Sequence, residues 1–96
     1  MDYLIQMGRS SVSFKAGDFV TDGFGWIMIL GNDNENIGIS ECICAIDSDN
    51  RLFLNPNSRY FFSKYASSSD KRRLLRVLAK HGYSYDSKNI RLVSEY

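Results

Sequence analysis

Apolar residues occur along the chain in short runs separated by polar turns, which is typical of a small domain built mainly from β-strands. The segment 26–30 (WIMIL) is apolar throughout and has the length of a strand. It is therefore predicted to be a central strand with both faces covered. The segment 37–46 is predicted to follow as a strand, and Glu41 interrupts its apolar face, which predicts a bulge or a sheet edge there. The apolar residues of that face are Ile37, Ile39, Ile43 and Ala45.

Five further segments have the composition of short strands and are separated by turns rich in Gly, Asn, Asp and Ser. These segments are 3–7, 12–14, 19–20, 52–54 and 59–65. The most polar turn, 31–36 (GNDNEN), is predicted to be an exposed loop. Short strands at this spacing favour a small curled antiparallel sheet or a partly open barrel.

The segment 69–81 has the periodicity of an amphipathic helix. Serines at 67–69 precede it as candidate N-cap residues, and Asp70 complements the positive end of the helix dipole. Gly82 follows where a left-handed C-terminal cap is expected. One arc of the helix, predicted to cover the sheet, contains Leu74, Leu75, Val77, Leu78 and His81. The opposite arc is basic and contains Arg72, Arg73, Arg76 and Lys80.

After the helix, the segments 83–85 and 90–93 alternate around the polar turn 86–89, which predicts a β-hairpin. The sequence therefore predicts one α+β domain over residues 1–96. Its parts are a small curled antiparallel sheet or partly open barrel, one C-terminal helix, and a final hairpin.

The formal net charge of +1 conceals an asymmetry between the two parts of the chain. Residues 1–58 contain three basic and eight acidic side chains, whereas residues 59–96 contain nine basic and three acidic ones. Either the two parts neutralise each other in the fold, or the basic part faces an anionic partner.

The basic residues of the predicted helix are the most informative feature. Arg72, Arg76 and Lys80 recur four residues apart, and like charges at this spacing destabilise a helix by a few tenths of a kcal/mol per pair. The arrangement suggests an anion, either in the acidic loops of the same chain or on a partner. A solvated charged face is the other interpretation.

No arrangement of residues indicates a catalytic site, a metal site or a cofactor site. His81 is the only histidine, and its place near the helix end suits a structural role. Cys42 and Cys44 would share one face of a strand, where a disulfide is geometrically poor, so both are interpreted as reduced thiols of a cytoplasmic protein. No apolar run is long enough to span a membrane, and the N-terminus is not expected to be a signal peptide.

Two stretches resemble small proteins of bacteria and their phages. The segment 14–20 (FKAGDFV) is similar to the F-K-x-G-D-x-V opening of many small SH3-like barrels. The segment 67–93, with its capped basic helix, Gly82, aromatic strand, turn and last strand, resembles the C-terminal unit of small phage and Bacteroidetes-type proteins. The resemblance implies an SH3-like, partly open barrel in a phage-encoded accessory protein. It implies no catalytic residues.

The sequence predicts a small non-enzymatic binding module that acts by contact with another macromolecule. The predicted contact residues are Arg72, Arg73, Arg76, Lys80, Phe24 and Trp26. The resemblance implies an anti-defence role in the cytoplasm of a bacterial host, by contact with a bacterial protein complex or by sequestering a nucleotide ligand. In that case the acidic loops 31–36 and 47–49, which could mimic phosphates, are a second candidate for the working surface.

The alternative is direct nucleic-acid binding, in which the basic helix face contacts phosphates and aromatic side chains stack on bases. The aromatic candidates are Trp26, Tyr60, Phe62 and Tyr83. A net charge of +1 is low for a general nucleic-acid binder. A homodimer that pairs through strand 37–46 is a further option, and no membrane partner is expected.

Overall fold

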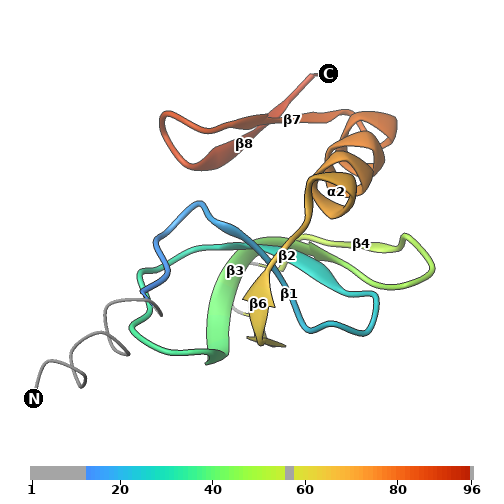
Figure 1. Cartoon of the computed structure of the whole chain (residues 1–96). Coiled ribbons are helices and arrows are strands. Elements are labelled where there is room, and N and C mark those ends of the chain that lie inside the picture. The colour runs from blue at the N-terminus through green and yellow to red at the C-terminus, as the bar shows by residue number, and fades with distance from the viewer. Residues whose placement is uncertain (1–12, 56–57, 96) are drawn as a thin grey trace, which may run out of the picture.

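The computed structural model describes residues 13–55 and 58–95, and the predicted strand at 3–7 lies outside them. Within these residues the chain forms a six-stranded sheet, one helix and a two-stranded hairpin (Figure 1). The strands of the large sheet are β1 (Phe19–Thr21), β2 (Ile27–Leu30), β3 (Gly38–Ile46), β4 (Leu52–Phe53), β5 (Arg59–Phe62) and β6 (Lys64–Tyr65). Helix α2 (Ser68–Lys80) and the hairpin strands β7 (Tyr83–Asp86) and β8 (Arg91–Ser94) follow. The predicted α+β class is confirmed.

The large sheet is antiparallel and has the strand order β4-β3-β2-β1-β6, with β5 paired to β3 off this path. Strand β2 is central and all four of its residues are buried, as its apolar run predicts. The predicted strand 59–65 is divided at Ser63, whose amide donates to the Thr21 carbonyl at 2.9 Å. The chain changes partner there, from β3 to β1. The sheet therefore curls but does not close.

Strand β3 contains a β-bulge two residues beyond Glu41. In its pairing with β2, Ile29 lies opposite Cys44 and Leu30 lies opposite Cys42, so Ile43 is an extra residue on β3. Such an insertion reverses the alternation of side chains between the two faces of a strand.

The bulge corrects the predicted faces of β3. Cys42 and Cys44 do not share a face but belong to two different apolar cores. Ala45 likewise points away from the face that carries Ile43. The other predicted members of that face, Ile37 and Ile39, are 50% and 62% exposed.

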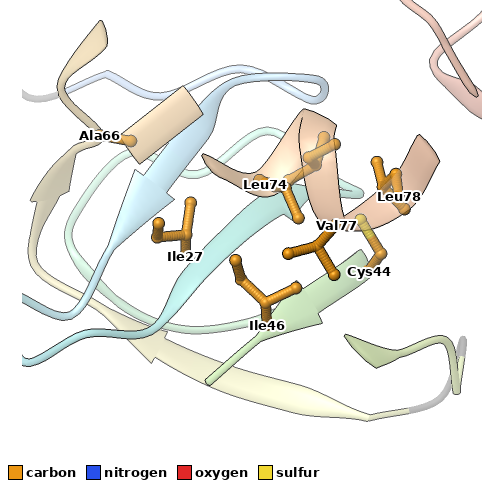
Figure 2. Close-up of a cluster of buried hydrophobic side chains, with 8 residues drawn as sticks. Ile27, Cys44, Ile46, Ala66, Leu74, Val77 and Leu78 are labelled. Atoms are coloured by element: carbon orange, nitrogen blue, oxygen red, sulfur yellow. The ribbon is translucent and has the colours of Figure 1, made fainter. Parts of the chain in front are cut away.

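Two apolar cores lie on the two faces of the sheet. The helix-side core, between the sheet and α2 (Figure 2), contains Ile27, Ile29, Cys44, Ile46, Ala66, Leu74, Val77 and Leu78. The inner core, inside the curl of the sheet, contains Phe14, Val20, Met28, Leu30, Cys42, Ala45 and Phe62. Alternate residues of β2 enter the two cores, because successive side chains of a strand point to opposite faces.

Helix α2 begins and ends within one residue of its predicted bounds. Ser67 is the N-cap: its hydroxyl accepts from the Asp70 amide at 3.1 Å, and the Asp70 carboxylate accepts from the Ser67 amide, which completes a capping box. At the other end His81 is the C-cap, and Gly82 follows with φ +86°, the left-handed conformation predicted there.

The face that α2 buries is narrower than predicted. Leu74, Val77 and Leu78 are buried against the sheet, at the spacing of neighbouring turns of a helix. Leu75 is 41% exposed, and His81 is exposed as well. Both residues lie at the border of the apolar arc, beyond the part of α2 that contacts the sheet.

The β7–β8 hairpin extends from α2 over the same side of the sheet (Figure 1). Tyr83, Tyr85 and Leu92 are half-buried against the helix-side core. The Tyr85 hydroxyl donates to the Gly17 carbonyl at 3.3 Å, which connects the hairpin to the turn before β1. Burial is the main reason that the pKa of Tyr85 is raised.

Candidate binding surface on helix α2

The outward side of α2 carries Arg72, Arg76 and Lys80, here called the basic stripe. All three side chains are exposed, and they lie along one side of the helix because residues four apart fall one turn above another. Among the residues that the structure describes, none of the three forms an ion pair or a side-chain hydrogen bond. Their charges are therefore unmatched within this part of the protein.

Arg73 adjoins the basic stripe, but its guanidinium forms hydrogen bonds within the chain. Its Nε donates to Asn50 Oδ1 at 2.7 Å, and its Nη2 donates to the carbonyl oxygens of Gly25 at 2.8 Å and Asp47 at 2.7 Å. The sequence left open whether the basic helix face contacts the acidic loops of the same chain. Among the described residues, only Arg73 makes such a contact with the turn 47–50, and it binds carbonyl and amide oxygens rather than carboxylates. Arg73 has a structural role here.

The turn 47–50, which Arg73 contacts, is ordered by the buried carboxylate of Asp47. Asp47 Oδ1 accepts from the amides of Asp49 and Arg51, both at 2.9 Å, and Oδ2 accepts from Arg51 Nε at 2.7 Å. The backbone hydrogen bond from Arg51 is the largest reason that the pKa of Asp47 is lowered. Asn50 adopts φ +63°, which asparagine tolerates better than most residues.

An open pocket of about 740 Å³ lies between this turn and the C-terminal half of α2. It is lined by Asp49, Asn50, Arg73, Arg76, Val77, Ala79, Lys80 and His81. His81 Nδ1 is 3.0 Å from the Val77 carbonyl oxygen, so it is the donor of that hydrogen bond and only Nε2 is left for a ligand. The pocket is bordered by Arg76 and Lys80 on the helix and by one carboxylate, Asp49.

Phe24 lies at the tip of a hydrogen-bonded turn whose Gly25 carbonyl accepts from Arg73, and its side chain is 85% exposed. Asp22 Oδ1 accepts from the amides of Phe24 at 2.7 Å and Trp26 at 3.2 Å, and Thr21 Oγ1 accepts from the Gly23 amide. Arg73 connects the same turn to α2 through the Gly25 carbonyl. The turn therefore presents a large apolar side chain on an ordered backbone.

Trp26, unlike Phe24, is half-buried. Its indole packs against the inner core, on the opposite face of the sheet from α2, where it stacks on Phe53 with ring centroids 5.4 Å apart. Tyr60 lies beside it at 5.5 Å. A second, smaller pocket of about 190 Å³ is found here, lined by Asp22, Trp26, Met28, Arg59, Tyr60 and Phe61.

This arrangement separates the residues that the sequence grouped into one nucleic-acid site. Trp26 and Tyr60 are on the face of the sheet that α2 does not cover, so they do not line one surface with the basic stripe. Phe62 is fully buried, and Tyr83 packs against the helix-side core. Arg59 was not predicted as a contact residue, because its only signal in the sequence is its place in an aromatic strand.

The described residues contain no group of three His, Cys, Asp or Glu side chains that could hold a metal ion. Burial raises the pKa of both Cys42 and Cys44 to about 12, so neither thiol is a nucleophile near neutral pH. In the part of the chain that the structure describes, no helix is long and apolar enough to span a membrane.

Comparison with known proteins found no matching family model, no matching curated protein and no matching solved structure.

Proposed function

We propose that the protein is a small non-enzymatic binding module that contacts an acidic surface of a protein partner through the basic stripe. The observation that carries this proposal is the contrast between Arg73 and its neighbours. Arg73 has three acceptors within the chain, whereas the exposed Arg72, Arg76 and Lys80 have no partner among the described residues.

In the part of the chain that the structure describes, the acidic side chains of the turn 47–50 pair with Arg51 and form no ion pair with the basic stripe. Asp47 accepts from Arg51, and Asp49 lies 3.8 Å from the same guanidinium. The mutual repulsion of the stripe residues is therefore relieved by solvent or by a partner. A partner with complementary charge would associate faster and more selectively than an uncharged one.

Phe24 is proposed as the apolar anchor of the same interface. Aromatic side chains contribute strongly to interface energies when they enter a pocket on the partner. The turn of Phe24 is already ordered by Asp22, Thr21 and Arg73, so binding would cost little additional conformational entropy. A role against a bacterial defence complex, suggested by the sequence resemblance, is one specific form of this proposal.

The proposal is tested by crosslinking from two positions on this surface. A photoreactive phenylalanine analogue is placed at Phe24 or at Arg76, and at Lys88 as an exposed position on the hairpin. The expected result is that one protein from a bacterial lysate is crosslinked from Phe24 and Arg76 but not from Lys88. Its binding should then be reproduced with the purified partner.

A matched pair of variants separates the basic stripe from net charge. Arg72→Ala/Arg76→Ala/Lys80→Ala and Lys15→Ala/Lys64→Ala/Lys88→Ala each remove three positive charges from exposed side chains. Only the first variant should weaken binding to the purified partner, by at least 10-fold, about 1.4 kcal/mol. Equal loss in both variants would overturn the role of the stripe.

Nucleic acid is the competing outcome of the same experiment. Fluorescence anisotropy with labelled single- and double-stranded oligonucleotides measures affinity against salt concentration. If the logarithm of the affinity falls steeply with the logarithm of the salt concentration, and this slope flattens only in the stripe variant, the basic stripe binds a phosphate backbone and the proposal of a protein partner is wrong.

A further inference from the structure

The outer face of β5 and the N-terminal half of β3 carries an exposed apolar group, here called the β3–β5 patch. It consists of Ile39 and Glu41 on β3 and of Arg59 and Phe61 on β5, and the exposed Ile37 directly precedes β3 in the chain. Ile37, Ile39 and Phe61 are 50%, 62% and 49% exposed. Ile39 lies directly opposite Phe61 in the antiparallel register, and Glu41 lies directly opposite Arg59. The four side chains therefore form two adjacent cross-strand pairs, one apolar and one charged.

The patch lies beyond the reach of α2 and the β7–β8 hairpin. On this face of β3, Ile43 packs against the helix-side core, whereas Ile39 and Glu41 are exposed. The inward-facing neighbours on the two strands, Ser40 and Phe62, are buried. A contiguous group of exposed apolar side chains favours an interaction surface.

We propose that the β3–β5 patch is a self-association surface that binds a second copy of this chain. In this dimer the two patches are stacked face to face. The twofold axis runs parallel to the strands, midway between the two sheets and above the line between β3 and β5, so that β3 of one copy lies over β5 of the other. Each Ile39 then lies over Phe61 of the second copy, and each Glu41 lies over Arg59 of the second copy. A patch made of such cross-strand pairs is self-complementary, which an isologous interface requires.

The charged pair favours a second copy over an unrelated partner. Although Glu41 and Arg59 are opposite each other in the register, they form no ion pair among the described residues. In the dimer each carboxylate would have a guanidinium beside it and another above it. An unrelated acidic or basic surface would satisfy one of these charges and oppose the other.

The interface is small, because it uses two short strand segments. A standard interface buries about 800 Å² on each partner, and smaller ones belong to weak complexes. The expected dimer is therefore weak and reversible. The patch shares no residue with the basic stripe or with Phe24, so dimerisation would leave both free and would present them twice to a multivalent partner.

Sedimentation equilibrium over a concentration series tests the proposal on the full chain. The expected result is a reversible monomer–dimer equilibrium that Ile39→Ser and Phe61→Ser each weaken by at least 10-fold. Phe24→Ser, which removes an even more exposed aromatic side chain outside the patch, should leave the equilibrium unchanged. Far-ultraviolet circular dichroism and thermal unfolding of each variant confirm that it is folded.

Charge exchange tests the symmetry itself. Glu41→Arg and Arg59→Glu should each abolish the dimer, because like charges then meet across the interface. The double variant restores the alternation of charge and should recover the dimer. A monomeric wild-type chain at all concentrations up to about 1 mM, a dimer that Phe24→Ser weakens as much as Phe61→Ser, or a double variant that stays monomeric would each overturn the proposal.

Discussion

Arg73 donates from Nη2 to the carbonyl oxygen of Gly25 at 2.8 Å, a contact between residues 48 positions apart in the sequence. The same nitrogen donates to the Asp47 carbonyl at 2.7 Å. One guanidinium therefore holds two turns of the sheet against the helix. These turns carry Phe24 and Asn50, so Arg73 fixes the position of both turns relative to helix α2 and its basic stripe.

Replacing Arg73 by Ala should destabilise the protein by about 2 kcal/mol, because it leaves carbonyl groups at a half-buried site without their donor. Arg73→Lys should recover only part of this loss, since an ammonium group cannot reproduce the planar fork of the guanidinium. Urea unfolding followed by tryptophan fluorescence measures both. Arg72→Ala is the control and should change the stability by less than about 0.5 kcal/mol. Equal effects at the two positions would contradict the structural role of Arg73.

Replacing Asp47 by Asn should make the free energy of unfolding depend less on pH in the acid range. Hydrogen bonds from Arg51 and Asp49 lower the pKa of Asp47 below its ordinary value of 3.8, so its carboxylate stabilises the fold fully above that value. The contribution is lost as pH falls from there through the lower pKa of the folded state.

Asp47→Asn should therefore be less stable than the wild type at pH 7, and the difference should narrow as the pH is lowered towards 2. Thermal unfolding at a series of pH values measures this. Glu35→Gln, which removes one negative charge from an exposed side chain of the 31–36 loop, is the control for the change in net charge at pH 7. A difference for Asp47→Asn that is constant with pH would contradict the role of its charge.

Replacing Gly17 by Ala should destabilise the contact between the hairpin and the sheet. Gly17 has φ +92°, and a Cβ atom there would lie 3.0 Å from the Tyr85 hydroxyl oxygen and 3.4 Å from Ile90 Cγ1. The left-handed backbone alone costs an L-residue roughly 1–2 kcal/mol. Gly31→Ala, whose Cβ would meet only ordinary contacts, should cost less.

A double-mutant cycle locates the clash at Gly17. Tyr85→Phe removes the hydroxyl that the new Cβ would meet, so the Gly17→Ala penalty should be smaller in that background. Chemical denaturation of the four proteins gives the coupling energy. Strict additivity would show that Gly17→Ala does not act through the Tyr85 hydroxyl.

Cys42 and Cys44 should both resist thiol reagents in the folded protein. Burial raises the pKa of each thiol to about 12, so hardly any thiolate forms near pH 8. Reaction with a disulfide reagent should be slow in buffer and should release two equivalents in urea. Ser87→Cys, at an exposed position, provides the fast control. Rapid reaction of either native cysteine would contradict its buried position.

The elements that local sequence specifies were predicted closely. The helix is recognisable because the residues that end it are next to it in the sequence: Ser67 is the N-cap, and Gly82 follows the C-cap. The C-terminal hairpin and the burial of β2 follow from the alternation and length of their apolar runs. The basic stripe is also a local feature, because residues four apart on a helix necessarily lie on one side.

The faces of β3 and the membership of the candidate site were not predictable in this way. The strand alternates regularly in sequence, but the extra residue at Ile43 is visible only once β2 is paired with it. That pairing sends Cys42 and Cys44 to opposite faces and leaves Ile39 exposed beside Phe61.

Local sequence and tertiary structure thus determined different features of this protein. Sequence alone determined the helix with its caps, the C-terminal hairpin, the α+β class and the position of the positive charges, because each depends mainly on residues close together in the chain. Tertiary structure decided that the Arg73 side chain is hydrogen-bonded within the described part of the chain while those of Arg72 and Arg76 are not, and that Trp26 packs against the inner core while Phe24 is exposed. These distinctions depend on partners more than 20 positions away, which no local pattern encodes.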